Sequence, residues 1–118
     1  VAQPLLKPEL AVIADESLYI QLKNLLTGTS IEVAAGPEAL VQAASVPADW
    51  IMGAIVGAAG LLPTLAAIKQ GTVVAIANKE VLVCAGEIVI SESLNYGATL
   101  LPVDSEHNAI FQVFDFER

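Results

Sequence analysis

Cysteine, basic residues and aromatic residues are all scarce in this chain of 118 residues. Its one cysteine, Cys84, excludes a disulfide framework and a cysteine-based zinc site, and favours a reducing compartment. Five Lys and Arg stand against 13 Asp and Glu, which gives a formal net charge of −8. That balance argues against a nucleic-acid-binding surface, so no nucleic-acid partner is expected.

Apolar residues, by contrast, are abundant. They make up 55% of the chain, and the mean hydropathy is +0.67, so the chain is not of the disordered class. Residues 50–68 carry no charge, which raises the alternative of a membrane-spanning helix. Gly53 and Gly57 have the GxxxG spacing found where transmembrane helices dimerise. Pro63 and the glycines divide this run into a strand, a turn and a short helix, so we expect no membrane span.

Short apolar runs alternate with longer amphipathic segments along the chain. Strands are predicted at residues 10–14, 31–34, 49–56, 72–77 and 99–103. Helices are predicted from residue 15 to just before Gly28, and at 37–44, 60–70 and 79–95. This order predicts an α/β fold, a Rossmann-like, mostly parallel sheet with helices on both faces. Strands buried on both faces explain the high hydropathy without lipid.

Two motifs that follow predicted strands hold candidate binding residues, because ligands of such folds bind at the carboxyl ends of the strands. Gly57 and Gly60 frame a GAAG segment that suits either a tight turn or the close approach of a cofactor. Asn78 and Glu80 suit the start of a helix, as a cap and a first-turn acid. Lys79 opposes the helix dipole there, which an anionic ligand would explain.

A third motif, PVDSEHN at residues 102–108, follows the last predicted strand. Asp104 and Glu106 can direct two carboxylates at one hard cation, and Ser105 can donate a hydrogen bond to the same ligand. The alternative is capping, in which Asp104 or Ser105 begins a helix that runs from about Glu106 to Phe114. His107 is not expected to be a ligand, because a hard metal prefers oxygen donors.

Three blocks of this sequence resemble 1-deoxy-D-xylulose 5-phosphate reductoisomerases. They are AIVGAAGLLPTL at 54–65, ANKE at 77–80 and LPVDSEHNAIFQ at 101–112, in the family's order and at compatible spacing. The resemblance implies an NADPH- and divalent-metal-dependent enzyme, an oxidoreductase and isomerase of non-mevalonate isoprenoid biosynthesis. Its substrate would be a small sugar phosphate, 1-deoxy-D-xylulose 5-phosphate, converted to 2-C-methyl-D-erythritol 4-phosphate.

The resemblance also implies roles for the residues around the metal and the substrate. Asp104 and Glu106 match the catalytic metal ligands, for Mg²⁺ or Mn²⁺. Lys79, Ser105 and Glu106 match substrate-binding positions. We expect the metal to act as a Lewis acid on the substrate carbonyl.

Four further residues match cofactor-binding positions of the family. Asn78 and Glu80 match residues that contact NADPH, and Gly57 and Ala58 are expected close to the nicotinamide. Family members are several hundred residues long and open with a glycine-rich phosphate loop that is absent from this sequence, as are a catalytic histidine and the residues that hold the substrate phosphate. The chain is therefore expected to be an internal fragment that is inactive alone.

The expected organisation is residues 1–101 as part of an NADPH-binding domain and 102–118 as the start of a catalytic domain that binds metal and substrate. The resemblance implies a homodimer, with a cytoplasmic location or a plastid-type organelle in a eukaryote. A second hypothesis is a non-catalytic nucleotide- or anion-binding α/β module. The intact Asp104 and Glu106 pair favours the enzyme, because a pure binding module does not need paired ligands for a hard metal.

Overall fold

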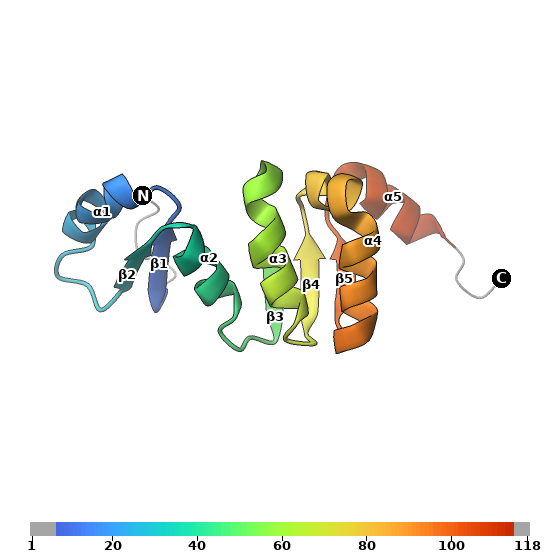
Figure 1. The fold of residues 1–118 in the computed structure, drawn as a ribbon, viewed down its shortest axis with the longest axis horizontal. Helices are drawn as coiled ribbons and strands as arrows, with labels where there is room; N and C mark the ends of the chain where they lie inside the picture. Colours follow the sequence, from blue (N-terminus) through green and yellow to red (C-terminus); the bar gives the residue numbers. More distant parts are fainter. Residues whose placement is uncertain (1–6, 115–118) are drawn as a thin grey trace. The chain divides into compact units, whose positions relative to one another are not determined.

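A computed structural model of the chain describes residues 7–114 and divides them into two compact units, which meet in sequence between Ala43 and Ala44. Figure 1 shows the order of the helices and strands along the chain. Each unit is built from parallel strands connected by helices.

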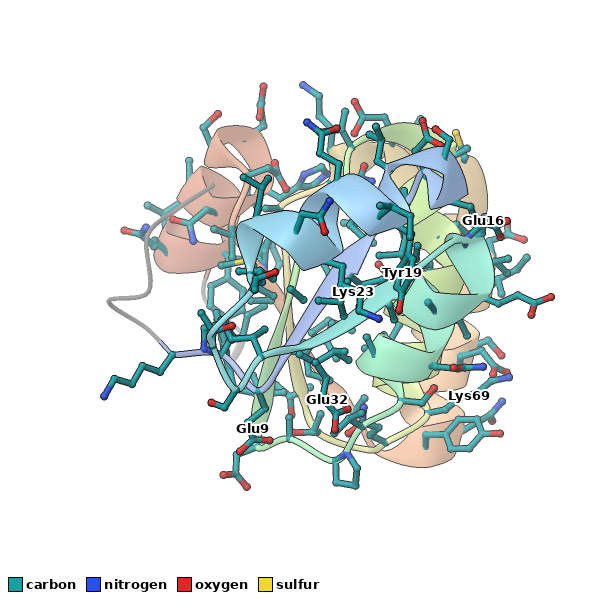
Figure 2. All side chains as sticks on the ribbon, turned by 90° about the vertical axis from the view of Figure 1, so that its left-hand side faces the viewer. Glu9, Glu16, Tyr19, Lys23, Glu32 and Lys69 are labelled. Carbon is teal, nitrogen blue, oxygen red and sulfur yellow. The ribbon has the colours of Figure 1, made fainter. Side chains whose placement is uncertain are left out.

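The first unit is a small βαβα arrangement. It contains β1 (Leu10–Ile13), the 3-10 turn η1 (Glu16–Leu18), α1 (Tyr19–Leu25), β2 (Glu32–Ala35) and α2 (Pro37–Ala44), which runs up to the division. Strands β1 and β2 pair in parallel. Figure 2 labels the Tyr19 and Lys23 side chains of α1. The ammonium nitrogen of Lys23 lies 5.8 Å from the centroid of the Tyr19 ring.

Asp15 begins the helical segment of this unit, as predicted, although the first turn is 3-10 rather than α-helical. Its Oδ1 accepts hydrogen bonds from the Ser17 hydroxyl at 2.7 Å and the Ser17 backbone N–H at 2.9 Å. These bonds, the hydroxyl first, lower the pKa of the Asp15 carboxyl below its usual value, because they favour the charged form.

The second unit holds all the predicted site residues. Its elements are β3 (Trp50–Gly53), the 3-10 turn η2 (Gly57–Gly60), α3 (Leu61–Ile68), β4 (Val73–Ile76), α4 (Lys79–Tyr96), β5 (Thr99–Pro102) and α5 (Ser105–Val113). The three strands form a parallel sheet in the order β3-β4-β5, so β4 is the central strand.

The core of the second unit lies between its sheet and the helices α3 and α4. Ile51, Val74 and Leu100 are paired in register across the three strands and pack together with apolar residues of both helices. Figure 1 shows α3 and α4 side by side in front of these strands. The fully buried side chains of this core include Ile68, Val74, Ile76, Val81 and Val89. The burial of these side chains holds the strands in place, and with them the carboxyl edge of the sheet, where the candidate site lies.

Helix α4 is interrupted near its start. Ala85 has φ −140° and ψ 24°, which are not helical values, so a first segment ending at Cys84 joins the rest through a kink. The helix ends at Gly97, whose φ of 69° lies in the left-handed region that favours glycine. Cys84 is exposed.

The predicted α/β fold with parallel strands is confirmed. The uncharged run at 50–68 divides as expected into β3, η2 and the eight residues of α3. Within residues 7–114, no helix has both the length and the apolar character that crossing a membrane requires.

Two predicted boundaries in this run are displaced. The strand expected over 49–56 ends at Gly53, because its partner β4 offers no pairing beyond Ile76 except the bond from the Ala77 N–H to the Gly53 carbonyl. The helix expected to begin at Gly60 is preceded by a 3-10 turn over the whole GAAG segment. The motif is thus a helical turn, and the α-helix proper begins at Leu61.

Candidate functional site

The three strands of the second unit end in one row. Gly53, Ile76 and Pro102 are register partners across the sheet. The ladder continues for one step, because Ala77 N–H donates to the Gly53 carbonyl at 3.0 Å and Val103 N–H donates to the Ile76 carbonyl at 2.9 Å. The GAAG, ANKE and DSEHN segments therefore leave the sheet at the same carboxyl edge, as the sequence predicts.

Asn78 begins α4 and is buried, with 4% of its surface exposed. Its Oδ1 accepts a hydrogen bond from the Glu80 backbone N–H at 3.0 Å, which confirms the predicted helix cap. Its Nδ2 donates to the carbonyl oxygens of Ile55 and Gly57, the second at 3.0 Å. One side chain thus connects the segment after β3 with the segment after β4.

Lys79 extends from the first turn of α4 toward the start of α5. Its Nζ lies 3.4 Å from Oε1 of Glu106, and the Ser105 hydroxyl donates to Oε2 of Glu106 at 3.0 Å. The cation that opposes the helix dipole therefore has a carboxylate partner within the described chain. Both charged side chains are more than half exposed, so solvent and ligands can reach this ion pair.

Asp104 caps α5 and is the more enclosed carboxylate, with 7% of its side chain exposed. Its Oδ1 accepts from the His107 backbone N–H at 3.0 Å and lies 2.7 Å from Nδ1 of the His107 ring. Its Oδ2 is the buried side-chain atom that, among residues 7–114, has no hydrogen-bond partner. A buried carboxylate oxygen without a partner is costly unless a ligand satisfies it.

Both carboxylates are held in their charged form. The His107 backbone N–H lowers the pKa of Asp104 most, against the opposing effect of partial burial, and the His107 ring adds to the lowering. Hydrogen bonding from its own backbone N–H lowers the pKa of Glu106 most, followed by the Ser105 hydroxyl and then Lys79. Ionised oxygen donors are the ligands that Mg²⁺ prefers.

These residues fit a hard divalent cation as a partial ligand set. Asp104 offers a free, enclosed oxygen, and Glu106 offers a second carboxylate two residues along the chain. In the part of the chain that the structure describes, no three His, Cys, Asp or Glu side chains gather as a complete metal site.

The remaining predicted residues lie at the same edge with fewer contacts. The side chain of Glu80 is exposed, and its backbone N–H is spent on the cap. Ala58 is exposed in η2, next to Gly57, whose φ is 71°.

Sequence reasoning missed the roles of His107 and Asn108, and it did not identify the partner of Gly60. His107 is expected only not to be a metal ligand, whereas the structure shows that it holds Asp104; its place three residues after a helix cap is the signal that could have revealed this. Asn108 Nδ2 donates to the Pro102 carbonyl at 2.8 Å and braces the turn between β5 and α5. Gly60 approaches Asn78 so closely that an added Cβ would lie 2.6 Å from Nδ2.

An apolar pocket of about 390 Å³ lies beside this edge. Residues of β5 and α5 contribute most of its lining, together with Ile76 and Leu82, and none of the predicted site residues lines it. The polar site is therefore on the open carboxyl edge rather than inside the pocket.

The fold and the edge place the chain in the class of parallel α/β proteins that present a lysine, a capping amide and paired carboxylates where the strands end. The model of the family described as 1-deoxy-D-xylulose 5-phosphate reductoisomerase matches residues 2–86. The chain belongs to this family.

Individual relatives agree with this assignment. The chain is 66% identical over 113 residues to the reductoisomerase of Rhodospirillum centenum, covering 96% of this chain and 28% of that protein. It is 62% identical over 104 residues to that of Zymomonas mobilis, covering 88% of this chain and 27% of the relative. The chain thus spans just over a quarter of the length of these curated relatives, in line with the expected fragment.

Solved structures give the same result. The Zymomonas mobilis enzyme in complex with NADPH superposes with a TM-score of 0.89 at 60% identity, covering 92% of this chain and 28% of that one. A DOX-P reductoisomerase in complex with NADPH, fosmidomycin and magnesium gives 0.87 at 43% identity, covering 93% and 28%.

Proposed function

We propose that this chain contributes part of the cofactor, metal and substrate sites of an NADPH-dependent 1-deoxy-D-xylulose 5-phosphate reductoisomerase. The product would be 2-C-methyl-D-erythritol 4-phosphate, an intermediate of isoprenoid biosynthesis. The observation that carries the proposal is the enclosed, unpartnered Oδ2 of Asp104, beside Glu106 and Lys79 on the carboxyl edge. Family membership and the NADPH and magnesium in solved relatives support it.

In this proposal Asp104 and Glu106 hold a divalent cation, Mg²⁺ or Mn²⁺. Such a cation, when bound, polarises the carbonyl of the substrate as a Lewis acid. His107 keeps Oδ1 of Asp104 occupied, so that Oδ2 faces the ligand. Ser105 donates its hydroxyl hydrogen at the same place, either to Glu106 or to a substrate oxygen.

Lys79 supplies positive charge for the anionic sugar phosphate, and its exposed Nζ can exchange Glu106 for a substrate oxygen. NADPH, when bound, supplies the hydride of the reduction. The GAAG turn, with Gly57 and Ala58, together with Asn78 and Glu80, forms the part of the edge assigned to the cofactor. The protein's contribution is to bring these groups together at one edge.

The wider organisation follows the same assignment. Residues 1–101 are proposed to belong to the NADPH-binding domain and 102–118 to begin the catalytic domain; 115–118 lie outside the described residues. A cytoplasmic homodimer is proposed for the whole enzyme, which sedimentation and cell fractionation would test. The 118-residue chain alone is expected to oxidise no NADPH in the presence of the sugar phosphate, since it offers only part of a metal site.

A chimera tests the proposal directly. In the Zymomonas mobilis relative, the segment that matches this chain is replaced by this chain, and consumption of NADPH is followed with 1-deoxy-D-xylulose 5-phosphate and Mg²⁺. The chimera is expected to turn over within about tenfold of the relative, a loss that small misplacements at the joints would explain.

Two matched substitutions in the chimera test the metal role. Asp104→Asn should reduce turnover by on the order of 100-fold or more, because it removes a ligand. Glu87→Gln, which removes an exposed carboxylate on α4, outside the predicted metal site, should leave turnover unchanged. A folded chimera without activity would refute the assignment, and an active Asp104→Asn variant would refute the metal role.

A further inference from the structure

The hydrogen-bonding capacity of the Asn78 side chain is almost entirely used within the protein. An asparagine amide carries two N–H donors and one oxygen with two acceptor sites. Nδ2 donates to Ile55 and Gly57, and Oδ1 accepts from the Glu80 backbone. Only one acceptor site on Oδ1 is left, and neither donor hydrogen is available to a cofactor.

The backbone of the turn over residues 57–60 lies very close to the Asn78 amide. At Gly60 an added Cβ would lie 2.6 Å from Nδ2 of Asn78 and closer still to the Ile55 carbonyl oxygen. The backbone of Gly60, at φ −76° and ψ −15°, is in the right-handed helical region, which any residue adopts. Glycine is therefore required here for the close approach and not for its conformation.

Asn78 and its neighbour together reach the ends of all three strands. Ile55 and Gly57 follow β3, Asn78 follows β4, and Lys79 contacts Glu106, which follows β5. The contact at Asn78 is buried, whereas the pair at Lys79 is exposed. The rigid element of this edge is thus the amide, and the exchangeable element is the ion pair beside it.

We propose that Asn78 is a positioning residue that couples the cofactor segment to the substrate segment. Its donors fix the GAAG turn, and its acceptor fixes the first turn of α4, which carries Lys79. The role in catalysis rests on the proposed function. Loss of the donors and the acceptor together should loosen the binding of NADPH and of the sugar phosphate in parallel, whereas loss of a direct cofactor contact would loosen NADPH alone.

The structural half of the proposal is tested on the 118-residue chain without ligands. Asn78→Ser keeps a side-chain oxygen that caps α4 but lacks the two donations. Backbone order parameters from NMR relaxation should fall at residues 57–60 from about 0.85 toward 0.6, while those of β4 stay high. Asn95→Ser, the same change at an exposed position of α4, should alter neither. An unchanged 57–60 turn in Asn78→Ser would overturn the proposal.

The functional half is tested in the chimera described above. Asn78→Ala, which removes both the donors and the cap, should raise KM for NADPH and KM for the sugar phosphate in parallel, each by about tenfold, the size typical of a supporting contact. Asn78→Ser, which keeps the cap, should raise mainly KM for NADPH. In Asn78→Ala, a rise confined to NADPH would show a direct cofactor contact and overturn the coupling. If the unsubstituted chimera is inactive, the proposed function fails, and the order parameters alone then decide whether Asn78 positions the turn.

Discussion

Replacement of Gly60 by alanine isolates the effect of the close approach at the carboxyl edge. The backbone of Gly60 is already helical, so alanine brings no conformational strain and should even help, by about 0.5–1 kcal/mol. The added methyl group, however, would lie 2.6 Å from the Asn78 amide nitrogen and against the Ile55 carbonyl, well inside van der Waals contact. The two effects oppose each other, and their sizes decide the sign.

Overpacking of a well-packed site costs about 1–3 kcal/mol. Displacement of the Asn78 amide would also weaken two hydrogen bonds worth about 0.5–1.5 kcal/mol each. If both bonds were lost in Gly60→Ala, subtraction of the gain from alanine leaves a destabilisation of the second unit by about 1–5.5 kcal/mol. Gly86→Ala is the matched control, because an added Cβ at Gly86 meets nothing within 4 Å and the residue lies in α4. That change should stabilise by about 0.5–1 kcal/mol.

Urea unfolding followed by tryptophan fluorescence is the assay. The chain has one tryptophan, Trp50 in β3, so the signal reports on the second unit. With a slope of about 1–3 kcal/mol per molar urea, a loss of about 2 kcal/mol lowers the midpoint by about 1 M. If Gly60→Ala were as stable as the parent chain, or if both substitutions shifted the midpoint alike, the close approach would not be what requires glycine.

Three further predictions concern single side chains. His107→Ala in the chimera should weaken Mn²⁺ binding, measured by electron paramagnetic resonance, by about 10-fold or more, and His107→Asn should restore it because its amide can replace the ring nitrogen at Asp104. Asp15 has a lowered pKa, so its stabilisation is present above the unfolded value and is lost as the pH falls through the folded value; the helix it caps should weaken below about pH 4, seen by NMR, but not in Asp15→Asn. Ile68→Ala, at a fully buried site, should cost about 2–5 kcal/mol in urea unfolding, whereas Leu62→Ala, at a site 63% exposed, should stay within about 0.5 kcal/mol.

The strands and helices were accessible from the sequence because their signals are local. Apolar β-branched runs such as residues 72–77 predict β4 to within a residue at each end, and the helix predicted over 79–95 ends one residue later, at Tyr96. For Gly60, by contrast, the sequence predicts a tight turn or a close approach without naming the partner, and the structure shows that the approach is to Asn78. A contact between residues 18 apart in sequence has no local signature, so the sequence alone does not show that Gly60 must be glycine to fit against Asn78.

The site shows the same division between local and distant contacts. The sequence predicts a cap at Asn78 and, as the alternative to a metal site, a cap at Asp104 or Ser105. These signals are local, because Asn78 and Asp104 each bond a backbone N–H two or three residues along. The pairing of Lys79 with Glu106 was not predicted, since these residues lie in the first turns of different helices, α4 and α5, and meet through the pairing of β4 with β5. Residue types and positions predict which groups reach the edge, and the register of the sheet decides which of them touch.

The strand order β3-β4-β5 also sets the sequence in which the edge is completed as the chain is synthesised. Once residues up to Tyr96 have emerged from the ribosome, β3, β4 and α4 can pack together. The hydrogen bond from the Asn78 amide to the Gly57 carbonyl can then form. Asp104 and Glu106 arrive only with β5, which among the described strands pairs with β4. A chain shortened to end at Tyr96 would therefore keep the hydrogen bond from Asn78 to Gly57 but lack both carboxylates. Metal binding would then report specifically on the docking of the last strand, β5.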